Sequence, residues 1–218
     1  QVEEQIGTEQ SIVEEKVESS ETFQVYRRIA RFNKLPMPVL VQWAFGTDGK
    51  VEGFFIKPVP QEAPSERLDY VTKAALRLPF TGSWFVFWGG RKLAENYHAS
   101  SIDQRFAFDF VIAREGRTHS GEGKANKDYF CFGEKILAPA AGTVLSVENT
   151  VEDNVPGVMN SDLPMGNHVI IDHGGGEYSF LCHLQQGTVA VKIGDKIKSG
   201  QVLGQCGNSG NSSEPTSW

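Results

Sequence analysis

The chain has 218 residues, of which 39% are hydrophobic and 22% are charged, and its formal net charge is −6. This ordinary globular composition excludes wholesale disorder and fibrous structure, and no run approaches 18 consecutive apolar residues, so no membrane span is expected. Residues 1–22 hold seven of the 27 acidic residues and one of the 21 basic ones, which leaves 20 of each in the rest. Without an excess of basic residues to neutralise phosphates, we expect no nucleic-acid partner.

Residues 1–60 predict a β-rich N-terminal module. Short runs that mix apolar and charged residues predict strands at 2–6 and 12–17, and alternation predicts another at 23–32. Two further runs, 38–45 and 51–56, flank a turn that contains Asp48 and Gly49, which is typical of a hairpin. We interpret the glutamates of residues 1–22 as a solvated face or edge of this sheet.

A proline-rich stretch at 61–82 predicts a linker, with one short helix at 66–77. The composition changes at residue 83, because the residues from there onward hold 18 of the 23 glycines, with short β-branched runs between them. This pattern predicts a compact antiparallel β domain over residues 83–218. The expected fold class is therefore mainly β.

Histidines, the residues best suited to catalysis or metal binding here, are most concentrated between residues 167 and 184. Two predicted strands meet at three glycines, with His173 closing the first strand and His183 lying in the second. Cross-strand neighbours lie within about 5 Å of each other. A hairpin of this kind can therefore bring histidines together.

Five motifs follow one another in an order typical of one enzyme family. They are residues 138–144 (APAAGTV), 166–173 (GNHVIIDH), 183–184 (HL), 194–201 (GDKIKSGQ) and 207–210 (GNSG). Over about residues 83–215 the chain resembles the lysostaphin/LytM-type zinc endopeptidases, and the shared order makes the resemblance specific. It implies a small β-rich domain with a groove, one zinc ion, and cleavage of peptide bonds in peptidoglycan.

The resemblance implies roles for three residues. The family binds zinc through a His and an Asp of one motif and a His of a later His-x-His motif, and Asp109 matches the aspartate. Because Arg105 stands where the family has its usual histidine, His98 is expected to be the second ligand, and His183 matches a catalytic histidine. Three protein ligands leave one position open, where zinc lowers the pKa of water toward about 7 and a histidine moves the proton.

The third ligand is expected after Pro215, in a His-x-His motif that the sequence lacks. Residues 216–218 read Thr-Ser-Trp, so a zinc ligand and a catalytic base are missing, and a truncated or altered carboxyl terminus explains this most simply. With two ligands left, zinc affinity should fall sharply, so we expect this chain to be weak or inactive as a peptidase. The alternative function is a non-catalytic cell-wall-binding or regulatory module that has lost the metal.

The other candidates have structural interpretations. We expect His168 and His173 to orient strands, and His119 to lie in an exposed loop. Cys182 should be in the core, because adjacent strand residues point to opposite faces and His183 faces the groove. Three widely spaced cysteines indicate neither a zinc knuckle nor a dense disulfide framework. The aromatic residues of 84–88 are expected to be core residues rather than a sugar platform.

Residues 49–58 (GKVEGFFIKP) resemble the last strands of a nuclear-transport-factor-like α+β module, which would make residues 1–60 an incomplete module. A biotinyl or lipoyl carrier is excluded, since Lys192 is the only lysine between residues 143 and 193 and does not lie at a hairpin tip. The expected partner is peptidoglycan peptide. A secreted, periplasmic or cell-envelope location follows from that substrate, although residue 1 begins no signal peptide. The oligomeric state does not follow from the sequence.

Overall fold

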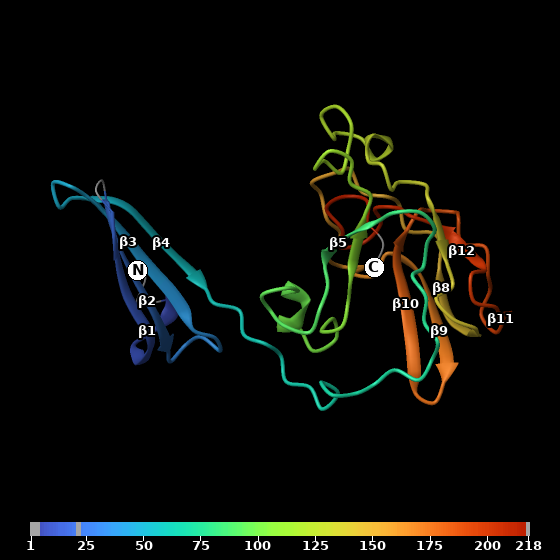
Figure 1. Ribbon diagram of the computed structural model, residues 1–218, viewed down its shortest axis with the longest axis horizontal. Coiled ribbons are helices and arrows are strands. Elements are labelled where there is room, and N and C mark those ends of the chain that lie inside the picture. Colours follow the sequence, from blue (N-terminus) through green and yellow to red (C-terminus); the bar gives the residue numbers. More distant parts are fainter. Residues whose placement is uncertain (1–4, 21–22, 217–218) are drawn as a thin grey trace. The chain divides into compact units, whose positions relative to one another are not determined.

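The computed structural model describes residues 5–20 and 23–216 and divides the chain into two compact units. The first unit comprises residues 1–64 with 99–103, and the second comprises residues 65–98 with 104–218. Both units consist of antiparallel strands joined by loops (Figure 1). Helical structure in the described ranges is confined to residues 5–6 and two short 3-10 helices, so the expected mainly β fold is confirmed.

The first unit is a four-stranded antiparallel sheet with the strand order β1-β2-β3-β4. Its strands are β1 (Glu9–Ser19), β2 (Phe23–Phe32), β3 (Val39–Gly46) and β4 (Val51–Pro58). The strands expected at 12–17 and 23–32 and the hairpin are therefore confirmed, and Gly49 takes the left-handed φ of +73° in the hairpin turn. Of the strand expected at 2–6, residues 2–4 lie outside the described residues, and Gln5 and Ile6 are helical rather than extended. The nuclear-transport-factor-like module stays a prediction.

The glutamates of β1 lie on an edge strand, as expected, and almost the whole strand is exposed. Basic residues of the neighbouring strand neutralise several of them. Arg28 pairs with Glu9 at 2.6 Å and with Glu15 at 3.2 Å, and Arg27 pairs with Glu18 at 3.0 Å. The uneven charge of the sequence is therefore distributed across the β1–β2 pair.

The second unit contains three sheets, the 3-10 helix η2 and the first two residues of the 3-10 helix η1. A four-stranded sheet has the order β10-β9-β8-β11, and the pairs β12-β7 and β5-β6 form two smaller sheets. The elements are β5 (Phe85–Trp88), η1 (Tyr97–Ser100), β6 (Asp109–Val111), η2 (Asn126–Asp128), β7 (Lys135–Leu137), β8 (Gly142–Glu148), β9 (Asn167–Gly174), β10 (Glu177–Leu184), β11 (Lys196–Ile197) and β12 (Val202–Gln205). Alternate residues of β9, including Val169 and Ile171, point into a core shared with β8, β10 and β12.

The helix expected at 66–77 is wrong, because several backbone N–H groups of this segment bond to partners outside it. Lys73 and Ala74 donate to the two carboxylate oxygens of Glu177, at 2.6 and 2.7 Å, and the Tyr70 hydroxyl donates to the same side chain at 2.7 Å. The Arg77 N–H donates to the Pro139 carbonyl at 2.9 Å. These donors would have to bond within the segment if it were a helix. The segment instead has a turn at residues 66–69 and is anchored to the Glu177 side chain at the start of β10.

The aromatic residues near β5 only partly match the expectation of a core. Trp84 packs against the core and stacks on Phe80, with 4.5 Å between the ring centroids. Phe85 and Phe87, by contrast, are about half exposed, so the core assignment is wrong for these two residues. Because β5 pairs with β6 alone, this two-stranded hairpin cannot bury the side chains on both of its faces.

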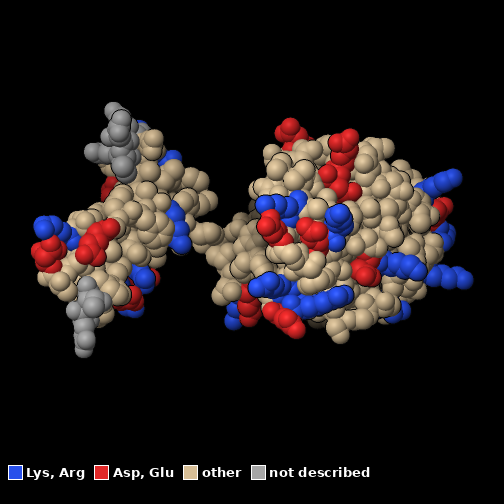
Figure 2. Space-filling view, turned by 90° about the horizontal axis from the view of Figure 1, so that it is seen from above, with Lys and Arg blue, Asp and Glu red and all other residues tan. Residues whose placement is uncertain are grey.

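No helix in residues 5–20 and 23–216 is long and apolar enough to cross a membrane. Basic and acidic side chains are interspersed over the face of the second unit that Figure 2 shows, without a broad area of one sign on that face.

Replacing Ile171 by alanine should destabilise the second unit by about 2–4 kcal/mol, because the side chain is fully buried and its loss leaves a cavity. Urea unfolding followed by tryptophan fluorescence measures the change. Ile193→Ala, at a position 67% exposed, is the matched control and should change the free energy by less than about 0.5 kcal/mol. Equal effects of the two substitutions would contradict the assignment of the core.

Candidate active site

Asn96 positions the loop that carries His98. Its side chain is fully buried, and its amide nitrogen donates to the carbonyls of Gly90 and Ala107, at 3.0 and 2.9 Å. Its amide oxygen accepts the N–H of His98 at 3.2 Å. One side chain therefore joins the end of β5, the segment before β6 and the start of η1. The sequence analysis assigned no role to Asn96.

His98 and Asp109 form a close, largely buried pair. His98 Nε2 lies 3.0 Å from Asp109 Oδ1, and the two side chains are 2% and 15% exposed. The Tyr97 ring lies beside the His98 ring, with 4.1 Å between centroids, and burial together with the Asp109 carboxylate raises the pKa of Tyr97. The structure thus brings together the two residues expected to be zinc ligands.

Gln104 fixes the tautomer of His98. His98 Nδ1 lies 3.0 Å from Gln104 Oε1, and because this oxygen only accepts hydrogen bonds, Nδ1 carries a proton. Nε2 therefore faces the Asp109 carboxylate either with a second proton or with its lone pair. In the second case, a cation between the two atoms takes the place of the proton.

The separation of this pair is compatible with shared coordination. Zinc lies about 2.0–2.2 Å from nitrogen and oxygen ligands in tetrahedral sites, which places two ligand atoms roughly 3.3 Å apart. The Nε2–Oδ1 distance of 3.0 Å is close to that value. His98 and Asp109 thus fit two positions of a zinc site, and they do not complete one.

His183 lies near the end of β10, where the ladder with β9 is interrupted between Leu181 and Leu184. Its backbone takes a left-handed φ of +58°, which is uncommon for a residue with a side chain. The His183 N–H donates to Met165, and its carbonyl accepts from Gly207, both at 3.0 Å. The interruption breaks the alternation expected for this strand, so that Cys182 and His183 are both buried.

Ser209 sets the protonation of His183. His183 Nδ1 donates to the Ser209 carbonyl at 2.8 Å, so Nε2 is the ring nitrogen that can accept a proton. Burial lowers the pKa of His183, the Ser209 carbonyl and Asp109 oppose this, and His98 adds to it. The two ligand candidates therefore act on the pKa of His183 in opposite directions. The loop 207–210 was recognised from its sequence motif, but the role of Ser209 was not predicted.

Thr216 marks where the expected third ligand would enter. Its hydroxyl donates to the carbonyl of Phe110 at 3.2 Å, one residue after Asp109, and its backbone pairs with Gly207. The described end of the chain therefore passes beside β6 and the loop that holds His183. Among the described residues, no group of three or more His, Cys, Asp or Glu side chains is arranged to hold a metal ion.

The remaining histidines have partners that suit a structural role. His168 lies between the Gly166 carbonyl (3.0 Å) and the Ser146 hydroxyl (3.2 Å), and His173 between the Ala141 carbonyl and the Ser179 hydroxyl, both at 2.8 Å. His119 was expected in an exposed loop, but it is half-buried against Tyr129.

Cys182 is unsuited to act as a nucleophile. The side chain is fully buried, and burial raises the pKa of its thiol to about 12. The thiolate, which is the reactive form, is therefore negligible near neutral pH. Cys131 and Cys206 are also free and buried.

Comparison with known proteins identifies one family. Residues 123–216 match the model of peptidase family M23, a range that includes His183 and begins after His98 and Asp109. No curated protein matches the chain. Two solved structures are similar to it. One is a candidate M23 peptidase from Pseudomonas aeruginosa, with 18% identity over 98% of this chain and 83% of that chain and a TM-score of 0.40. The other is a zinc-containing peptidase from Vibrio cholerae, with 14% identity over 89% of this chain and 51% of that chain and a TM-score of 0.41. This chain thus spans about half the length of the Vibrio structure.

We expect the His183 ring to stay neutral at pH 6.5, with its proton on Nδ1, because burial lowers its pKa. Below pH 6.5 the unfolded chain takes up a proton that the folded chain does not, so His183 makes the free energy of unfolding fall as the pH drops toward the folded pKa. Histidine NMR spectra recorded across this range measure the titration, and His183→Gln assigns the signal. A midpoint at or above pH 6.5 would contradict the buried neutral ring.

Proposed function

We propose that this chain, whose residues 123–216 match the model of peptidase family M23, is a zinc-dependent endopeptidase of the LytM type that hydrolyses peptide bonds in peptidoglycan. The observation that carries the proposal is the largely buried His98–Asp109 pair, with 3.0 Å between Nε2 and Oδ1. Peptidoglycan lies outside the cytoplasm, so the proposal also places the protein in the cell envelope or among secreted proteins.

In this proposal, His98 Nε2 and Asp109 Oδ1 are two zinc ligands. A zinc ion held there supplies Lewis-acid polarisation of the peptide carbonyl and activation of water near neutral pH. Gln104 orients the His98 ring through Nδ1, as outer hydrogen-bond partners of metal-binding histidines do. Asn96 keeps the loop of His98 beside β6.

His183 is the proposed general base. Its Nδ1 proton is held by Ser209, so Nε2 accepts the proton of the attacking water and later delivers it to the leaving amine. Burial keeps the ring neutral and therefore able to accept a proton at pH 7. The strained backbone at φ +58° holds the ring in one orientation.

Residues 216–218 read Thr-Ser-Trp, so the residues given supply two of the three zinc ligands that the proposal needs. Two ligands alone bind zinc much more weakly than three. The alternative is a non-catalytic cell-wall-binding or regulatory module that has lost the metal. Metal content and hydrolysis separate the two functions.

Restoring the motif should restore the metal site. In the double variant Thr216→His with Trp218→His, the imidazole at position 216 lies beside Phe110 and adds a third ligand, so zinc affinity should rise at least about a hundredfold. Zinc per chain is measured by mass spectrometry after dialysis, and activity by release of soluble fragments from purified peptidoglycan. The unaltered chain should hold less than one equivalent and release little.

Asp109→Ala, placed in the restored variant, should abolish both zinc retention and hydrolysis, because it removes one of the three ligands. Asp162→Ala is the matched control, since this carboxylate is exposed and lies outside the site. If the restored variant retains no zinc yet binds peptidoglycan, the binding module is correct. If Asp109→Ala leaves hydrolysis intact, the ligand assignment is wrong.

A further inference from the structure

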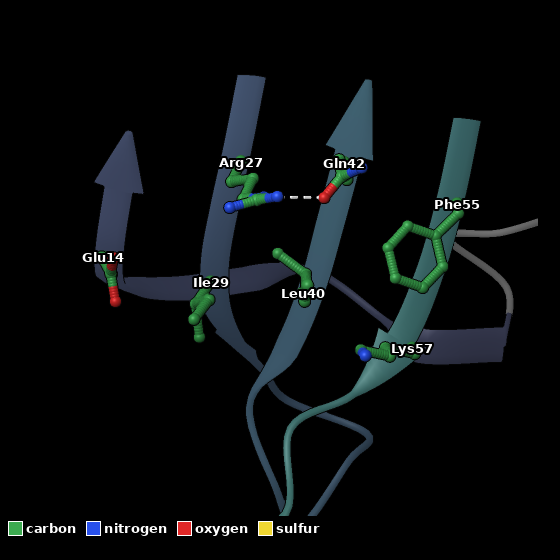
Figure 3. A pocket seen from close by; sticks show the side chains of 7 residues that line it. All are labelled: Glu14, Arg27, Ile29, Leu40, Gln42, Phe55 and Lys57. Carbon is green, nitrogen blue, oxygen red and sulfur yellow. Dashed lines mark hydrogen bonds between the residues drawn. The ribbon is translucent and has the colours of Figure 1, made fainter. Parts of the chain in front are cut away.

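A shallow pocket lies on one face of the sheet in the first unit. Its lining residues come from all four strands, and their side chains point to the same side (Figure 3). They are Glu14, Arg27, Ile29, Leu40, Gln42, Phe55 and Lys57. We call this side of the sheet the pocket face.

One row of the pocket face runs straight across the strands. Glu14 pairs with Ile29, Ile29 with Leu40, and Leu40 with Lys57. The row therefore reads acidic, apolar, apolar, basic from β1 to β4. Neighbouring strands lie about 4.8 Å apart, so the two charges are separated by roughly 14 Å and cannot pair with each other.

The two end charges have no ionic partner in the described part of the chain, and Lys57 Nζ lies over the Phe55 ring, 5.3 Å from its centroid. Between them, Ile29 and Leu40 are half-buried, and Phe55 is 38% exposed. The pocket face thus offers an apolar centre flanked by one unpaired charge of each sign.

We propose that a second copy of this chain packs on the pocket face about a two-fold axis that runs parallel to the strands. Such an axis places β1 of one copy opposite β4 of the other. Glu14 then faces Lys57 of the second copy, Lys57 faces its Glu14, and the Ile29 and Leu40 side chains meet in the middle. The contact is isologous, because both copies use the same surface.

The charges select this axis over the alternative. A two-fold axis running across the strands would keep β1 opposite β1, and Glu14 would face Glu14 while Lys57 faced Lys57. Like charges opposed across an interface are unfavourable. The row is therefore self-complementary in one arrangement and self-repelling in the other.

The face is small, so the dimer should be weak. Four strands over three rows of side chains cover roughly 400 Å² per copy, from the strand spacing and the rise per residue. This area is at the low end for specific interfaces. We expect the association to depend on protein concentration in the micromolar to millimolar range.

Sedimentation velocity of the full chain over this concentration range tests the proposal. Glu14→Lys and Lys57→Glu should each raise the dimer dissociation constant at least about tenfold, because each substitution creates two like-charged pairs by symmetry. The double variant Glu14→Lys with Lys57→Glu reverses both charges, and it should return the constant to within about threefold of the original.

Lys50→Glu is the matched control, because it changes the net charge equally but lies in the exposed β3–β4 turn, and it should leave the constant unchanged. Circular dichroism checks that each variant keeps its strands. A chain that stays monomeric up to about 1 mM overturns the proposed surface. So does a dimer whose dissociation constant is unchanged by both single substitutions. A double variant as weak as the single variants overturns the proposed two-fold axis.

Discussion

The site depends on the buried side chain of Ser209. Its hydroxyl accepts the N–H of Asn167 at 2.9 Å and donates to the Leu184 carbonyl at 2.8 Å. The backbone carbonyl of Ser209 accepts a hydrogen bond from Nδ1 of His183. The surrounding backbone is so close that a Cβ atom on Gly166 or Gly210 would clash, and both glycines have left-handed φ angles. The motifs at 166–173 and 207–210, distant in sequence, are therefore two halves of one contact.

This contact also accounts for the unusual backbone of His183. A left-handed conformation costs a residue with a side chain about 1–2 kcal/mol. Hydrogen bonds to Met165, Gly207 and Ser209 hold the residue there, and Asn167 fastens the adjoining carbonyl of Leu184 at 3.0 Å. The strain is offset by neighbours that are themselves buried. A proton acceptor that is both buried and fixed in orientation is the result.

Local patterns predicted much of this fold, because strands and hairpins depend on near neighbours in sequence. The β3–β4 hairpin follows from Asp48 and Gly49 between two β-rich runs. The segment 66–77 was not predictable, because its conformation depends on Glu177, about a hundred residues away. His98, Asp109 and His183 were predicted from residue type and motif order. The supporting roles of Asn96, Gln104 and Ser209 depend on contacts in the folded chain, so they were found only in the three-dimensional structure.

A proton and a metal cation compete for the same place between His98 and Asp109. Gln104 contacts Nδ1, so Nε2 is the ring nitrogen that faces Oδ1 of Asp109. A proton needs only these two atoms, whereas zinc gains most of its affinity from further ligands. Whether zinc or a proton is bound there is therefore governed by further ligands, and not by the pair itself. The same geometry thus suits an ion pair in a binding module and two ligands in a peptidase, and the third ligand decides between them.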